Sequence, residues 1–270
     1  MKTLILFLTL VLPVALSPAV SVDGANIHFS VYQGGPKTVI FVHGWTCDET
    51  SWQEQIPALG QAGYRMITMD LPGHGKSGAP TSGALTMDLF ARAIEAVRVE
   101  AKAGKVVLVG HSMGTPVILN YAHLFPANVA GLVPVDGGLA LRNGAANTDF
   151  LKGADGRKNR ESMIRGMFSK STTPEMQQHI LQMMLGPSES MAAQAMATMS
   201  GPSPWSKDAM TFPVLGLYAD HSGAVSEADF KKQFPNGKRV EIAGTGHFLM
   251  LEKPSDFNKQ LMAYLATVKF

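Results

Sequence analysis

The chain has 270 residues, of which 46% are hydrophobic and 16% are charged, with a formal net charge of +2 at pH 7. This composition excludes a disordered protein and fits one large domain, or a core domain with an insertion. The basic residues are scattered apart from one short cluster at 157–160, so we expect no nucleic-acid partner.

The first 19 residues have the three regions of a secretory signal peptide in order. Lys2 precedes an apolar run at 4–12, Pro13 ends that run, and small residues beyond it suit cleavage after about Ala19. The rival interpretation is a membrane anchor, but the run is shorter than the ~20 residues that a spanning helix needs. We therefore expect a secreted or periplasmic protein without stable membrane insertion once the signal is removed.

Strand and helix patterns alternate through the rest of the chain. The sequence predicts strands at 26–32, 37–42, 65–69, 105–109, 129–135, 214–218 and 239–242. It predicts helices at 51–62, 87–103, 115–124 and 255–268. Nearly continuous apolar strands separated by helices are typical of a parallel sheet that is covered on both faces. Functional sites in such sheets form at the carboxyl ends of the strands.

Residues 138–208 interrupt this alternation and hold eight of the sixteen methionines. We interpret the segment as a helical cap over the strand ends, inserted between core segments at 20–137 and 209–270. Methionine is flexible and polarizable, so these side chains either line a pocket for varied apolar groups or simply pack the helices together. If they line a pocket, replacing the segment with a linker should change which apolar groups are accepted more than the reactivity of a catalytic group at the strand ends.

The most informative motif is Gly110-His111-Ser112-Met113-Gly114, which lies between a predicted strand and a predicted helix. A serine between two glycines at such a junction predicts a nucleophile elbow, because side chains at the flanking positions would clash in so sharp a turn. The turn would expose the hydroxyl of Ser112 and direct the backbone N–H of Met113 at the same space. The side chain of His111 is expected to face the packing of the elbow.

A serine hydroxyl needs a base, and the base needs an acid that orients it. His247 is the best candidate for the base, because it follows the last predicted strand in a glycine-flanked loop. His221 is its one serious competitor, because it also follows a strand end. The backbone N–H of Trp45, after another predicted strand, would complete an oxyanion hole with that of Met113. The candidate substrate-binding residues are Gly44, His111, Met163 and Met167.

The order of these motifs resembles the α/β-hydrolase superfamily. The matching segments are His43-Gly44-Trp45, Asp70-Leu71-Pro72-Gly73-His74-Gly75-Lys76-Ser77, the elbow pentapeptide and Gly246-His247. The resemblance covers nearly all of the chain after the signal. It implies an eight-stranded, mostly parallel sheet, a cap inserted after the sixth strand and a triad of serine, acid and histidine. The serine excludes the branches with an aspartate nucleophile, namely haloalkane dehalogenases and epoxide hydrolases.

The acid is where the chain departs from the pattern of that superfamily. Most members place it after the seventh strand, but the matching turn here reads Ala219-Asp220-His221-Ser222, with serine at the usual position. Some members use the end of the sixth strand, where this chain has Asp136 before two glycines. We favour Asp136 and keep Asp220 as the alternative. The competing role for Asp136 is to cap the turn that leads into the cap segment.

Together these residues predict a secreted serine hydrolase that cleaves carboxylic esters of small to medium apolar acyl groups through an acyl-enzyme. The mechanism needs no metal or organic cofactor, and the expected partner is a small-molecule ester. A lactonase, a peptidase or a hydrolase of carbon–carbon bonds is compatible with the same residues, because the triad alone does not choose the bond. The alternative from another class is a non-catalytic ligand-binding member of the fold. No sequence feature indicates an oligomeric state.

Overall fold

The structure is a computed structural model that describes residues 19–220 and 222–270. The predicted signal peptide therefore lies outside the described residues, except for Ala19. Within the described ranges, every helix is too short or too polar to cross a membrane.

In the part of the chain that the structure describes, eight strands form one sheet in the order β1-β2-β4-β3-β5-β6-β7-β8. The strands are β1 (Ala19–Val22), β2 (Ala25–Tyr32), β3 (Thr38–Val42), β4 (Arg65–Met69), β5 (Val106–His111), β6 (Val129–Val135), β7 (Leu215–Ala219) and β8 (Lys238–Ile242). β2 pairs antiparallel with β1 and with β4, and the other neighbours pair in parallel. The predicted eight-stranded, mostly parallel sheet is confirmed, and β1 is the one strand that the sequence analysis missed.

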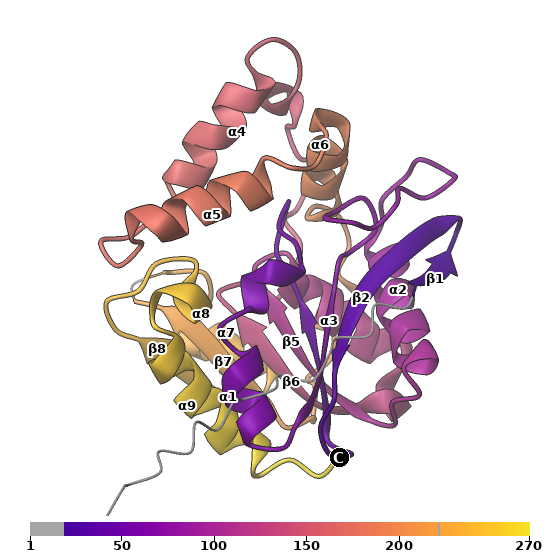
Figure 1. Ribbon diagram of the computed structural model, residues 1–270, viewed down its shortest axis with the longest axis vertical. Coiled ribbons are helices and arrows are strands. Elements are labelled where there is room, and N and C mark those ends of the chain that lie inside the picture. The colour runs from indigo at the N-terminus through magenta and orange to yellow at the C-terminus, as the bar shows by residue number, and fades with distance from the viewer. Residues whose placement is uncertain (1–18, 221) are drawn as a thin grey trace, which may run out of the picture.

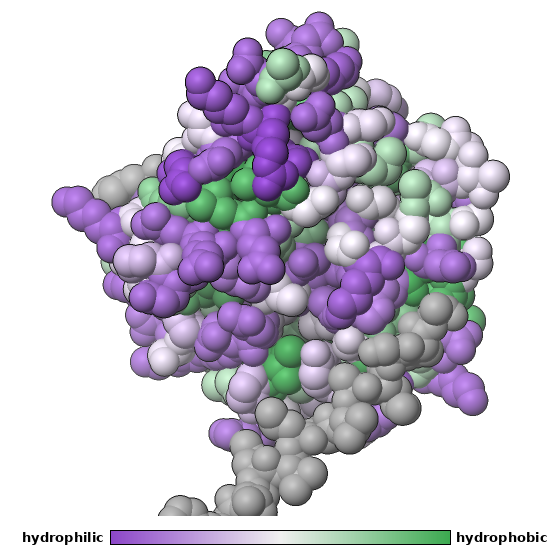
Figure 2. Space-filling model, turned by 45° about the horizontal axis from the view of Figure 1, so that its top comes forward, coloured by the Kyte–Doolittle hydropathy of each residue, from purple (hydrophilic) through white to green (hydrophobic). Residues whose placement is uncertain are grey.

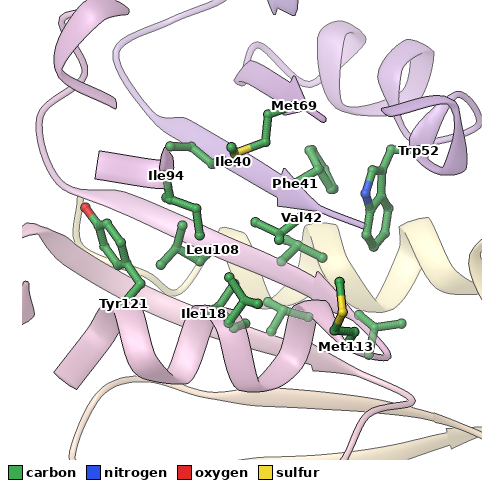
Figure 3. Packing of buried hydrophobic residues seen from close by; sticks show 14 of the residues in the cluster. Ile40, Phe41, Val42, Trp52, Met69, Ile94, Leu108, Met113, Ile118 and Tyr121 are labelled. Atoms are coloured by element: carbon green, nitrogen blue, oxygen red, sulfur yellow. The ribbon is translucent and has the colours of Figure 1, made fainter. Parts of the chain in front are cut away.

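The middle of the sheet is buried on both faces. Every residue of β3, β5 and β6 is buried. Helices α1 (Ile56–Gln61) and α9 (Pro254–Leu265) pack together on one face, and α2 (Met87–Glu100) and α3 (Gly114–Leu124) on the other (Figure 1). Figure 3 shows Leu108 of β5 packed beside Ile94 of α2 and Ile118 of α3. This apolar packing fixes the positions at which β5 and β6 end.

The single helix predicted over 51–62 is wrong. The structure has a 3₁₀ helix at Glu49–Trp52 and then α1, which begins at Ile56. Pro57 explains the break, because proline lacks an N–H and is tolerated only in the first turn of a helix. The other three predicted helices are present as α2, α3 and α9, and the prediction lacks α7 (Glu227–Gln233) and α8 (Leu249–Glu252).

Three helices between β6 and β7 form a cap at the top of the molecule (Figure 1). They are α4 (Gly156–Arg165), α5 (Pro174–Met184) and α6 (Glu189–Thr198). The segments that enter and leave the cap are joined by a parallel bridge between Arg142 and Ser200. The predicted helical cap after the sixth strand is therefore confirmed. Figure 2 shows hydrophobic surface recessed beneath the hydrophilic outer face of this top region.

Candidate active site

Ser112 lies directly after β5 in a turn that only glycines can flank. Its φ of 51° is in the left-handed region, which is strained for a residue with a Cβ. A Cβ at Gly110 would overlap the carbonyl oxygen of Gly114, and a Cβ at Gly114 would lie 2.5 Å from that of Val42. The N–H of Ser112 donates to the carbonyl of Val135 at 2.8 Å, which ties the turn to β6. The local geometry is that of the predicted elbow.

His247 and Asp136 form a direct hydrogen bond. Nδ1 of His247 lies 2.7 Å from Oδ2 of Asp136, within the distance expected for an acid that orients a base. Oδ1 of Asp136 accepts the N–H of Ala219 at 3.1 Å. The two residues are 111 positions apart in the chain. They meet because β6, β7 and β8 are parallel neighbours, so the segments that follow them emerge at the same edge of the sheet.

The environment of Asp136 keeps its carboxyl group ionised. Burial alone would raise its pKa, but the hydrogen bond and charge of His247 and the N–H of Ala219 outweigh burial, and the pKa lies below its ordinary value. An anion at this position holds the proton of a neutral imidazole on Nδ1. Nε2 of His247 is then the nitrogen that accepts a proton.

Asp220, the alternative acid, lies on the next strand end. Its Oδ2 accepts the N–H of Gly244 at 3.0 Å, in the loop that leads to His247. The structure thus places Asp136 against Nδ1 of His247, while Asp220 binds the backbone of the loop that leads to His247. His221, the alternative base, lies outside the described residues. Ser222, at the usual position of the acid, lines the same cavity as Asp220.

A cavity of about 810 Å³ lies between the cap and the core, and Ser112, Asp136 and His247 all line it. Half of the cap methionines also line it, namely Met163, Met167, Met196 and Met199. Others pack in the protein interior, such as Met184, which is 2% exposed. The two alternatives for the methionines therefore hold for different residues. Sequence reasoning missed many of the other lining residues, among them Arg142, Asn143, Phe150 and Phe168 between β6 and α5.

Trp45 and Met113, the candidate oxyanion donors, come from the segments that follow β3 and β5. Met113 is the N-cap residue of α3, so its N–H lies at the positive end of that helix. Trp45 follows β3 and lines the cavity. Its indole N–H donates to the carbonyl of Ala192 in α6 at 2.8 Å, which joins its loop to the cap.

His111 and Gly44, the other candidate substrate-binding residues, are not among the described residues that line the cavity. His111 is 1% exposed, and its Nε2 lies 2.8 Å from the carbonyl oxygen of His247. Burial lowers the pKa of His111 to about 3, so the ring is neutral and Nε2–H donates to that carbonyl. A Cβ on Gly44 would lie 3.1 Å from the Cβ of Ser112. His111 thus supports the loop of His247, and Gly44 lets the loop after β3 approach Ser112.

Among the described residues, one group of side chains has the types and spacing that could bind a metal. Ligand atoms of His28, Glu49 and Asp70 lie within 4.8 Å of one another. Glu49 lies 2.8 Å from His28 and accepts from Nζ of Lys76 at 3.1 Å. Asp70 accepts the backbone N–H groups of Glu49 and Lys76 at 2.7 and 2.8 Å. Since all three already have protein partners, the group is a polar network that holds the loop after β4.

Comparison with known proteins identifies the family. Residues 37–162 match the family model described as the alpha/beta hydrolase fold. A candidate aryl esterase from Burkholderia cenocepacia is 26% identical and superimposes with a TM-score of 0.80, covering 93% of this chain and 98% of that one. The chain belongs to the α/β-hydrolase superfamily, as its motifs indicated.

Two further relatives are named for different activities. The dihydrolipoyllysine-residue acetyltransferase component of the acetoin cleaving system of Cupriavidus necator is 27% identical over 259 residues, which are 90% of this chain and 67% of that protein. The 2-hydroxy-6-oxononadienedioate/2-hydroxy-6-oxononatrienedioate hydrolase of Escherichia coli is 35% identical over 116 residues, which are 42% of this chain and 40% of that protein. The matches thus span about two thirds of the first relative and less than half of the second.

Proposed function

We propose that the chain is a secreted serine hydrolase that cleaves carboxylic esters of small to medium apolar acyl groups. The observation that carries this proposal is the 2.7 Å hydrogen bond between His247 and Asp136 on the wall of the cavity that Ser112 also lines. An imidazole oriented by an anion is the base that a serine hydroxyl requires. The likeness to the candidate aryl esterase favours an ester as the bond that is cleaved.

In the proposed reaction, Nε2 of His247 takes the proton of Ser112 as the hydroxyl oxygen attacks the acyl carbon. The negative charge that develops on the carbonyl oxygen is stabilised by the backbone N–H groups of Trp45 and Met113, which are worth a few kcal/mol in such sites. His247 then gives its proton to the departing alcohol, and the acyl group remains on Ser112. A water molecule, deprotonated by His247, attacks this ester, and the acid leaves as Ser112 regains its proton.

The cavity wall supports apolar acyl groups as the preferred substrates. Met163 and Met167 come from the cap, and their flexible side chains adapt to acyl groups of different shape. The signal-like sequence that precedes β1 supports export, and an exported hydrolase suits the scavenging of external esters.

Hydrolysis of p-nitrophenyl esters from acetate to decanoate by the purified protein tests this function. Ser112→Ala should keep the fold and lower kcat by a factor of about 10³ or more, as removal of other triad serines does. A fluorophosphonate should label Ser112 in the parent and leave the variant unlabelled. Near-full activity of Ser112→Ala, or labelling at another residue, would refute the nucleophile. A folded parent that binds these esters without turnover would instead support the non-catalytic alternative. Faster turnover of lactones or peptides than of esters would change the type of bond that we propose is cleaved.

A further inference from the structure

A buried carboxylate joins the cap to the loop that carries His247. Oε1 of Glu252, the last residue of α8, accepts the hydroxyl of Thr172 at 2.7 Å. Its Oε2 accepts the hydroxyl of Ser169 at 2.9 Å and the backbone N–H of Gly246, the residue before His247. Glu252 is 8% exposed. Its two oxygens therefore accept three hydrogen bonds, two from the cap and one from the base loop.

The same two segments also touch directly. The hydroxyl of Ser171 donates to the carbonyl of Gly244 at 2.7 Å. A Cβ on Gly246 would lie 2.8 Å from the Cβ of Ser169, so the cap leaves no space there for even a methyl group. Because densely packed segments do not deform continuously, a displacement of one is passed to the other.

The cap segment that makes these contacts is also part of the substrate cavity. Met167, Phe168 and Ser169 line it, a few residues from Thr172. Ser169 lines the cavity and also bonds to Glu252, which accepts the N–H of Gly246. A substrate that displaces this wall is therefore expected to displace Glu252 and Gly246 with it. The loop of Trp45 is joined to α6 in a similar way, through the bond from its indole to Ala192.

We propose that Glu252 is a positioning residue that makes cap segment 167–172 and the loop of His247 act as one unit, so that contact between substrate and cap sets the reach of His247 toward Ser112. The inference rests on the proposed function, because it takes His247 as the base. A misplacement of about 1 Å in such a site can cost 10²-fold in rate. In contrast to the expectation from sequence, we now expect replacement of residues 138–208 by a linker to reduce the reactivity of Ser112 as well as acyl selectivity.

The test is a substitution in the cap that touches neither the substrate nor the base loop. Thr172 is 4% exposed and is not among the described residues that line the cavity. Its hydroxyl donates to Glu252 and accepts the N–H of Ser169 at 2.8 Å, so Thr172→Val loosens cap segment 167–172 from Glu252. Thr198→Val is a matched control, because the hydroxyl of Thr198 donates only within its own helix, to the carbonyl of Ala195 at 2.7 Å. We expect Thr172→Val to lower kcat for p-nitrophenyl acetate, and the rate at which a small fluorophosphonate labels Ser112, by about tenfold. Both rates of Thr198→Val should stay within about twofold of those of the parent, because this change leaves His247 in place, whereas a misplaced catalytic group can cost about 10²-fold.

Variants of Glu252 complete a double-mutant cycle with Thr172→Val. Glu252→Leu removes all three acceptors and should lower the labelling rate by up to about 10²-fold, whereas Glu252→Gln keeps the shape and one acceptor oxygen and should recover part of that loss. In the double variant Thr172→Val/Glu252→Leu, the losses should not multiply, because both act through the same contact. If Glu252→Leu fails to fold, Thr172→Val alone decides the outcome.

Two results would overturn the coupling in an active parent: a labelling rate of folded Thr172→Val equal to that of Thr198→Val, or losses that multiply in the double variant. Circular dichroism and thermal melts establish that each variant is folded. A parent in which Ser112 reacts with neither ester nor phosphonate would overturn the proposed function, and the coupling with it.

Discussion

Replacing Asp136 with asparagine removes one charge and keeps the shape of the side chain. Asparagine tolerates the φ of 42° at this position, so the variant is expected to fold. The carboxylate uses one oxygen for Nδ1 of His247 and the other for the N–H of Ala219, but an amide has only one oxygen. If that oxygen remains on Ala219, the NH₂ group donates to Nδ1 and moves the imidazole proton to Nε2. Nε2 then no longer accepts the proton of Ser112.

We expect kcat of Asp136→Asn to fall on the order of 10⁴-fold, the scale measured for the same change in another triad. This equals about 5.4 kcal/mol of transition-state stabilisation at 1.36 kcal/mol per factor of ten. The full effect is expected because Asp136 is 6% exposed and solvent screens its charge little. Steady-state hydrolysis of p-nitrophenyl acetate measures the loss. Asp220→Asn is the control, and it should cost less than about tenfold because Asp136 already holds Nδ1.

A folded Asp136→Asn that keeps more than a tenth of the parent kcat would refute the assignment of the acid, as would a larger loss for Asp220→Asn. Thermal melts add an independent check. Because the pKa of Asp136 is depressed in the folded state, its charge stabilises the fold above the ordinary value of 3.8, and this contribution is lost as the pH falls through the folded pKa. The difference in stability between parent and variant should therefore shrink as the pH is lowered from 7 toward 3.

Three further predictions concern stability, the cavity and the elbow. Burial lowers the pKa of His74 from 6.5 to about 3, so between these pH values the unfolded state binds a proton that the folded state does not. The parent should therefore lose stability as the pH falls from 6.5 toward 3, and thermal melts of His74→Gln should show a flatter dependence of stability on pH. Met163→Ala and Met167→Ala should each lower kcat/KM for hexanoate relative to acetate esters by about 10-fold, because each removes apolar surface from the cavity, and an unchanged ratio would place the acyl group elsewhere. Gly114→Ala should lower the free energy of unfolding in urea by about 1–3 kcal/mol or more, because its Cβ would lie 2.5 Å from the carbonyl oxygen of Val42, and a neutral result would contradict the tight elbow.

The sequence by itself determined the features that depend on neighbouring residues. Seven of the eight strands were predicted. Apolar runs predicted the central ones, since a strand buried on both faces must be apolar along its length, and alternation of apolar and polar residues predicted β2. Gly110 and Gly114 together predicted the elbow. The steric conflict at Gly110 arises within five residues of chain, with the carbonyl of Gly114, whereas the conflict at Gly114 is with Val42 of β3 and depends on the tertiary structure. The break before α1 was also encoded locally, in Pro57, but the apolar periodicity of 51–62 concealed it.

Only the tertiary structure decided which distant side chains meet. Asp136 and Asp220 both follow strands that neighbour the loop of His247, and the choice depends on which carboxylate points at Nδ1 across 111 residues of chain. The contact of Thr172 with Glu252 spans 80 residues and has no periodic signature. Hydrophobic patterns report how deeply a residue is buried, whereas the direction of a polar side chain depends on the register of parallel strands and on how the cap settles over them. For that reason the sequence could predict Ser112 as the nucleophile, while the orientation of His247 and the contacts between the cap and its loop required the assembled fold.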